Sequence, residues 1–204
     1  MLLLLAAALA AEPAVPNSLL DRVVARAGDP YREPGLAFTF VAGDTSRAHR
    51  WDIPGQKAEV RWTDKEGRAC VAVVPVPYAG DDPVLKQAWA LFTNDQYWLL
   101  APSKWKDPGT RVETRDNALV VSFEGVGLTP KDRYVATIDP VTADVTGWEY
   151  TLESGRTGAW AWAPPTAVGG LHLSLERTSP ERTIRFTGVI SAPVALGAPG
   201  GTCG

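Results

Sequence analysis

Cysteine and histidine are both scarce in this chain of 204 residues, which contains two of each. Neither a Cys-x-x-Cys nor a His-x-x-x-His pair occurs, so the sequence offers no spacing that is typical of a metal site. We therefore expect no metal ion and no other cofactor.

Long runs of one charge are also absent. The chain has 20 Lys and Arg against 23 Asp and Glu, a formal net charge of −3, and these residues are scattered. Nucleic-acid-binding domains usually carry a basic patch, so we expect no nucleic-acid partner. The hydrophobic fraction of 45% is typical of a globular protein, and the length suits one domain.

Recognisable catalytic motifs are missing as well. No Gly-x-Ser-x-Gly sequence is present, and His49 and His172 are expected at solvent-facing or edge positions of strands, with no nucleophile motif after them. The spacing of the acidic residues favours no glycosidase pair; we considered Asp52, Asp81, Asp82, Asp107 and Glu124. We interpret the chain as non-catalytic, with a hydrolase as the least favoured alternative.

The first residues resemble a signal peptide. A short apolar run ends in Ala8-Leu9-Ala10, and Glu12 and Pro13 follow directly. The run is shorter than the roughly 20 residues of a membrane-spanning helix, although it lacks the usual preceding basic residue. We expect a signal peptide over 1–11, export to the periplasm or beyond, and a soluble mature protein with a single domain over 12–196.

The two cysteines leave an open question. Cys70 and Cys203 could pair in an oxidising compartment, or they could remain two separate thiols. Residues 197–204 are rich in glycine, and we expect them to form a flexible tail.

Alternation of apolar and polar residues dominates the rest of the chain. In one strand pattern Ala58, Val60 and Trp62 alternate with polar neighbours, and about ten or eleven such short runs are separated by turn sequences. Helical spacing occurs over 19–27 and over 83–92, and a strand of large apolar residues is expected after Asn94-Asp95. This pattern predicts a mainly β (α+β) fold, in which one curved antiparallel sheet of about 10–11 strands wraps around the helices.

Three stretches carry a resemblance to a known family. They are residues 94–102 (NDQYWLLAP), 106–109 (KDPG) and 122–130 (SFEGVGLTP). They resemble an uncharacterised family of exported bacterial proteins related to the LolA/LolB lipoprotein-carrier superfamily. The resemblance implies an open β half-barrel with helices on its concave face, enclosing a hydrophobic cavity for acyl chains. It assigns no functional residue to this chain.

Large apolar residues are the candidates for lining such a cavity. We expect Trp62, Trp89, Leu91, Phe92, Trp98, Leu100, Phe123, Trp148, Tyr150, Trp160 and Trp162 to face it. The helix over 83–92 would then be a lid. The alternative for each residue is an ordinary place in the core.

The resulting hypothesis is a periplasmic carrier of a lipid, or of a lipoprotein's acyl chains. Its partners would be a lipid or acylated protein and a transient membrane or lipoprotein partner, and the monomer is favoured. A second hypothesis is an envelope protein-interaction domain with a packed core and no small ligand.

Overall fold

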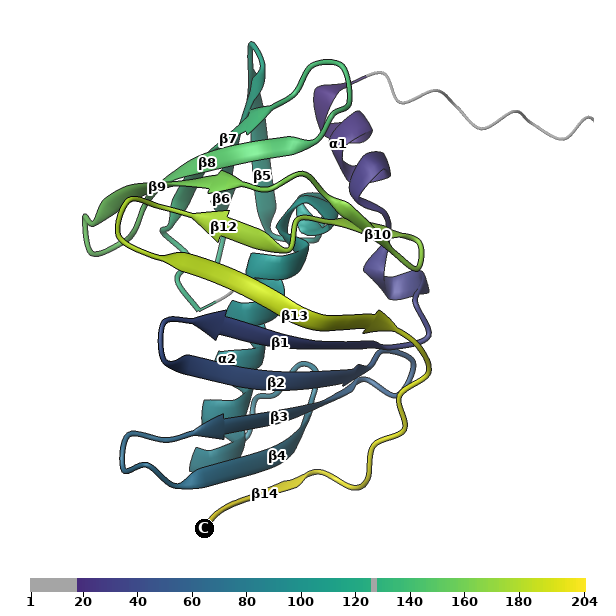
Figure 1. Cartoon of the computed structure of the whole chain (residues 1–204), viewed down its shortest axis with the longest axis vertical. Helices are drawn as coiled ribbons and strands as arrows, with labels where there is room; N and C mark the ends of the chain where they lie inside the picture. Colours follow the sequence, from purple (N-terminus) through teal and green to yellow (C-terminus); the bar gives the residue numbers. More distant parts are fainter. Residues whose placement is uncertain (1–17, 126–127) are drawn as a thin grey trace, which may run out of the picture.

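The computed structural model describes residues 18–125 and 128–204 (Figure 1). The signal peptide expected over 1–11 lies outside the described residues. The helices are α1 (Leu19–Ala27) and α2 (Pro83–Leu100), with short 3-10 segments η1 (Pro30–Arg32) and η2 (Ala101–Lys104). Neither α-helix is long and apolar enough to cross a membrane.

Fourteen strands occur in the described part of the chain. They are β1 (Leu36–Ala42), β2 (Thr45–Asp52), β3 (Lys57–Thr63), β4 (Ala69–Pro75), β5 (Thr110–Arg115), β6 (Ala118–Phe123), β7 (Arg133–Ile138), β8 (Val145–Thr151), β9 (Thr157–Trp162), β10 (Thr166–Val168), β11 (Leu171–Leu173), β12 (Glu176–Thr178), β13 (Thr183–Ser191) and β14 (Gly200–Cys203). The count exceeds the expected ten or eleven because several strands have only three or four residues, too few to show alternation.

Twelve of these strands form one antiparallel sheet. Its order is β14-β4-β3-β2-β1-β13-β12-β9-β8-β7-β6-β5, and its two edge strands do not pair with each other, so the sheet stays open. Helix α2 packs against β3 and β4 near one edge, and its Trp98 also touches Trp148 and Trp160 on β8 and β9. One helix reaches both regions because the sheet curves around it (Figure 1). The predicted open curved antiparallel sheet with helices on its concave side is confirmed.

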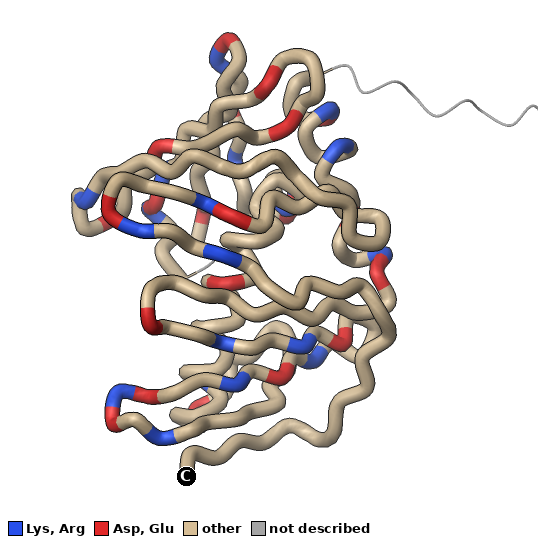
Figure 2. The backbone as a smooth tube through the Cα atoms, viewed as in Figure 1, with Lys and Arg blue, Asp and Glu red and all other residues tan. Residues whose placement is uncertain are grey.

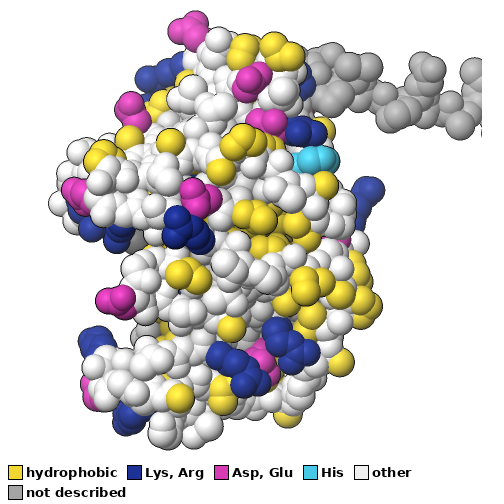
Figure 3. Space-filling model, viewed as in Figure 1, with side chains coloured by type: hydrophobic (Ala, Val, Ile, Leu, Met, Phe, Trp, Pro, Cys, Tyr) yellow, Lys and Arg dark blue, Asp and Glu magenta, His cyan; other side chains and the backbone are white. Residues whose placement is uncertain are grey.

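The two faces of the sheet differ as the alternation predicts. Ala58, Val60 and Trp62 of β3 are buried, whereas the intervening Glu59 pairs with Arg61 across 2.9 Å on the opposite face. Charged residues of both signs are scattered over the face turned away from α2 (Figures 2 and 3). The core therefore lies between the concave face and the helices.

Helix α1 begins where the sequence indicates. The Ser18 hydroxyl accepts a hydrogen bond from the backbone N–H of Asp21, and the Asp21 carboxylate accepts one from the backbone N–H of Ser18. This reciprocal pair is a capping box. It satisfies two donors that the first turn of a helix otherwise leaves unpaired.

Helix α2 is longer than expected. Asn94-Asp95 does not end it, and the apolar residues up to Leu100 that we assigned to a strand continue the helix. The reason is a long-range contact: the buried Asp95 carboxylate accepts two hydrogen bonds of 2.6 Å from Arg47 on β2. A residue that favours turns by local propensity is here held in a helix by its tertiary partner.

His49 is also placed differently from the expectation. It shares the inward face of β2 with Trp51, and only 1% of it is exposed. Its Nε2 lies 2.8 Å from the Asp95 carboxylate, and its ring stacks on Phe38 at 4.7 Å. His49 and Arg47 therefore anchor α2 to the sheet.

The C-terminal residues are held by a disulfide. Cys70 on β4 is bonded to Cys203, which answers the question that the sequence left open. Residues 197–204, expected to be a flexible tail, contain β14, which pairs with β4 from Gly200 opposite Val73 to Cys203 opposite Cys70 (Figure 1). The covalent bond offsets the flexibility of the glycines by fixing the register of this short edge strand.

Candidate functional site

A cavity of about 260 Å³ lies between α2 and the strands β5 to β7. Its lining includes the exposed residues Asn94 and Leu128, so the cavity opens to the surface. Five of its lining residues are aromatic: Trp89, Tyr97 and Trp98 come from α2, and Phe123 and Tyr134 come from β6 and β7.

The helix geometry explains which residues reach this space. Trp89, Thr93, Gln96 and Tyr97 follow one another at spacings of four, three and one, so they share one side of α2. All four line the cavity. The continuation of α2 beyond Asp95 is what places Gln96, Tyr97 and Trp98 there.

A layer of closely packed aromatic rings supports the cavity wall. Tyr97 contacts Phe123 edge-on at 5.6 Å and lies parallel to Trp148 at 6.4 Å. Trp98 meets Trp148 and Trp160 edge-on at 5.0 and 5.3 Å. Packed rings of this kind hold one another in place, so the wall has a defined shape.

One side of the cavity is polar. Lys104 and Asp107 both line it, and the Lys104 ammonium donates hydrogen bonds of 2.5 Å to the Asp107 carboxylate and to the Tyr31 hydroxyl. The Tyr31 hydroxyl in turn donates to the same Asp107 oxygen over 2.9 Å. We call Tyr31, Lys104 and Asp107 the rim cluster.

The rim cluster has a defined protonation state. Burial alone would lower the pKa of the Lys104 ammonium, but Asp107 and Tyr31 outweigh it and hold that pKa above its ordinary value. Burial also raises the pKa of the Tyr31 hydroxyl, against the opposing effect of Lys104. At neutral pH the lysine is therefore charged and the tyrosine neutral.

The structure separates the eleven residues that the sequence nominated. Trp89, Trp98 and Phe123 line the cavity, and Trp148 and Trp160 pack directly behind Trp98. Trp62, Phe92 and Leu100 are buried in the core, Leu91 and Tyr150 are partly buried against it, and Trp162 lines a separate pocket of about 20 Å³.

Sequence reasoning missed several residues of the cavity. The sequence prediction omits Tyr97 because it places a strand after Asn94-Asp95, and the period of two of a strand turns a different set of residues inward than a helix does. Lys104 and Tyr134 are not among the residues that the sequence nominates for the cavity, and Asp107 is only one of five acidic residues whose spacing favours no pair. Tyr31 and Lys104 are 73 residues apart, so only the folded chain brings the rim cluster together.

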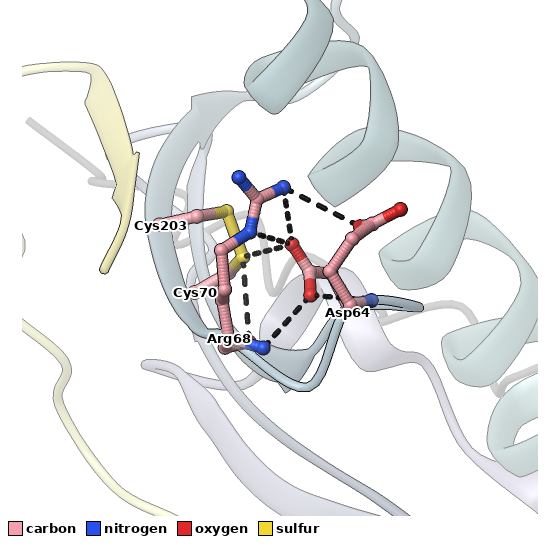
Figure 4. A network of polar contacts seen from close by, with 5 residues as sticks. Asp64, Arg68, Cys70 and Cys203 are labelled. Carbon is pink, nitrogen blue, oxygen red and sulfur yellow. Dashed lines mark hydrogen bonds and ion pairs between the residues drawn. A yellow bond between two sulfur atoms is a disulfide. The ribbon is translucent and has the colours of Figure 1, made fainter.

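Two polar groupings elsewhere could suggest chemistry. The side chains of His49 and Asp95 are fully buried, so in this arrangement neither can meet a substrate. Asp64, Cys70 and Cys203 lie close enough to hold a metal ion. The two sulfur atoms are bonded to each other, however, and Asp64 pairs with Arg68 at 2.7 Å, so these groups are already engaged (Figure 4).

A buried arginine stands apart from both groupings. Arg177 on β12 is fully buried, with its guanidinium 3.7 Å above the Trp162 ring and one hydrogen bond to the Ser174 carbonyl. Its Nε and Nη2 have no partner, and no acid pairs with it among the described residues. Burial lowers the pKa of Arg177 to about 9.

Replacing Arg177 with methionine should raise the free energy of unfolding, by on the order of 1–4 kcal/mol at pH 7. The buried charge disfavours the folded state, and methionine removes it with little change in volume. Because the lowered pKa means that the folded state binds its proton less tightly, the gain should be full below pH 9 and decline above it. Urea unfolding at pH 7 and pH 10 measures this, with the exposed Arg156→Met as control; a loss of stability in Arg177→Met would contradict it.

Comparisons with known proteins identify no family. No family model matches the sequence, and no curated protein matches it. Three solved structures are similar in shape. A LolA superfamily protein from Nitrosomonas europaea has a TM-score of 0.49 and 10% sequence identity, and the match covers 90% of this chain and 96% of that one. A putative outer membrane lipoprotein-sorting protein domain from Vibrio parahaemolyticus has a TM-score of 0.42, 7% identity and coverages of 84% and 89%, and a DUF1329 family protein from Desulfovibrio piger has a TM-score of 0.43, 11% identity and coverages of 88% and 93%. At these scores the likenesses say nothing about function.

Proposed function

We propose that the protein is an exported, non-catalytic carrier that holds one apolar chain of a lipid or of an acylated protein in the cavity beside α2. The observation that supports this most directly is the cavity itself, about 260 Å³ with partly aromatic walls and the rim cluster at one side. A packed interaction domain would have no use for such a volume. The apolar N-terminal run supports export to the periplasm.

The size of the cavity limits what it holds. Pockets for drug-sized ligands span about 300–1,000 Å³, so this one lies just below that range and suits a single chain or part of one. Covering each methylene group contributes about 0.8 kcal/mol, so eight of them contribute about 6 kcal/mol. One chain therefore binds usefully without any polar chemistry.

Helix α2 forms one wall of the cavity, and we propose that it takes the role of a lid. The helix carries Trp89 and Trp98 and is anchored through Asp95 near its middle. A cavity that opened fully would expose these rings to water, which favours aggregation. The anchor limits how far the helix opens when a ligand enters at the rim.

The first experiment is mass spectrometry of an organic extract of the mature protein, expressed with export and purified without detergent. A stoichiometric lipid, fatty acid or acylated peptide is the expected result. An empty extract, repeated after incubation with membrane vesicles, would contradict the carrier function and favour the packed interaction domain.

A variant that fills the cavity gives a second test. Thr93→Trp places a large ring in the cavity, and we expect it to reduce binding of a dodecyl probe at least about tenfold. Gln87→Trp is the matched control, because Gln87 is exposed on the same helix and does not line the cavity. Isothermal titration calorimetry measures both; equal affinities for the two variants would exclude this cavity as the binding site.

A further inference from the structure

We infer that the rim cluster selects ligands by headgroup, favouring a zwitterionic or dipolar headgroup over one with a net charge. This inference rests on the proposed function, because it concerns the polar end of a chain held in the same cavity. It adds the chemical class of the ligand to the proposal that an apolar chain is bound.

The first step is the charge balance of the rim. Lys104 and Asp107 carry opposite charges only 2.5 Å apart, with side chains 15% and 27% exposed. A headgroup beside them interacts with both charges at once. The attraction of an anion to Lys104 is largely cancelled by repulsion from Asp107, and for a cation the signs are reversed.

The second step is the hydrogen-bonding capacity that remains. An ammonium has three donors, and Lys104 uses two of them for Asp107 and Tyr31. Asp107 accepts both of its side-chain hydrogen bonds at Oδ2, and its Oδ1 has no partner among the described residues. The rim therefore offers one donor on a positive group and one acceptor oxygen on a negative group.

The third step is complementarity. A zwitterionic headgroup places an anionic and a cationic group a short distance apart, so its phosphate can face Lys104 while its ammonium faces Asp107. Each charge of the headgroup then lies beside a rim residue of opposite charge, and neither lies beside a like charge. A headgroup with a single charge leaves one member of the ion pair in contact with a like charge, which is how a site rejects a ligand.

The test uses three probes with the same dodecyl chain: dodecylphosphocholine, dodecanoate and dodecyltrimethylammonium, each below its micelle concentration. Calorimetry and the tryptophan fluorescence, to which Trp89 and Trp98 in the cavity wall contribute, report binding to the full mature chain. We expect the zwitterionic probe to bind about tenfold more tightly than either charged probe. This ranking needs only the wild-type protein, so it does not depend on whether a variant folds.

Variants then assign the preference to its residues. Asp107→Asn should shift the ranking toward dodecanoate about tenfold, and Lys104→Met should shift it toward dodecyltrimethylammonium. Lys86 and Asp81 form an ion pair at 2.7 Å that does not line the cavity, so Asp81→Asn and Lys86→Met are the matched controls. Far-UV circular dichroism checks that each variant is folded.

The outcomes separate this inference from the proposed function. If all three probes bind the wild type equally, or if Asp107→Asn leaves the ranking unchanged, the headgroup selection is wrong and the chain-binding cavity stands. If no dodecyl probe binds the wild type, the proposed function fails and the selection fails with it.

Discussion

Replacing Cys203 with serine should lower the free energy of unfolding by about 2–5 kcal/mol at pH 7 and 25 °C. The Cys70–Cys203 bond closes a loop with a sequence separation of 133, which spans most of the described chain. Without the bond the unfolded chain gains conformational freedom, and in the chain-entropy model a loop of about 100 residues is worth about 4.7 kcal/mol. Urea unfolding followed by circular dichroism measures the loss.

The same substitution should loosen one edge of the sheet. Strand β14 has only four residues, two of them glycine, and pairs only with β4, so it depends on the disulfide more than a central strand would. Hydrogen exchange at the β4 amides opposite β14 should become faster in Cys203→Ser.

The neighbouring substitution Thr202→Ser keeps the disulfide and is the matched control. Wild-type protein treated with a reducing agent should unfold at the same urea concentration as Cys203→Ser. A variant as stable as the oxidised wild type would mean that the bond contributes nothing, and β14 would then be held by its backbone hydrogen bonds to β4 and its contacts with α2.

The sheet illustrates what local pattern can predict. Ala58, Val60 and Trp62 alternate with charged neighbours, and this period of two identifies a strand. Because successive side chains of a strand point to opposite faces, the same pattern also tells which face is buried and which is solvated. The Ser18–Asp21 capping box likewise marks the start of α1, since both partners lie within one turn. In each case the determining contacts are local in sequence.

The features that the pattern could not predict depend on contacts between distant residues. Asn94-Asp95 favours a turn by itself, yet Asp95 stays helical because Arg47, 48 residues earlier, binds its carboxylate. The glycines of the C-terminal tail suggest flexibility, yet Cys203 pins them to β4. Neither partner is visible in the local sequence.

The sequence predicts only part of the candidate site, because the rest also depends on contacts between distant residues. Large aromatic residues are recognisable as candidates from their size, and Trp89, Trp98 and Phe123 do line the cavity. Whether an aromatic residue lines a cavity or fills the core depends on the curvature of the sheet and on the rotation of α2, which the sequence does not encode locally. Trp148 and Trp98 have the same size, but of the two only Trp98 lines the cavity.

Replacing Asp95 with alanine should be among the most destabilising single substitutions in this protein, at about 3–5 kcal/mol. The Asp95 carboxylate is fully buried, and it accepts hydrogen bonds from Arg47 through two nitrogen atoms and from the Asn94 amide, and lies 2.8 Å from His49 Nε2. Its removal leaves Arg47, whose side chain is only 17% exposed, without a counter-ion. The loss of stability therefore comes mainly from leaving the Arg47 charge without a partner, rather than from the loss of one attraction.

A double substitution separates these two contributions. Arg47→Met together with Asp95→Ala removes both charges, so the pair of changes should cost less than the sum of the two single changes. Asp81→Ala is the control, because its side chain is fully exposed in the ion pair with Lys86, and it should leave the urea midpoint unchanged. If the costs of the two single changes simply add in the double variant, the charge of Arg47 is not the cause.

The anchor also connects stability to the cavity. Gln96, Tyr97 and Trp98 directly follow Asp95 on α2 and line the cavity, so loss of the anchor should displace that wall. We therefore expect Asp95→Ala to weaken binding of a dodecyl probe even where the sheet remains folded, at low temperature and without urea. Unchanged affinity in a folded Asp95→Ala protein would show that the wall is held by its aromatic contacts instead, through Trp98 on Trp148 and Trp160.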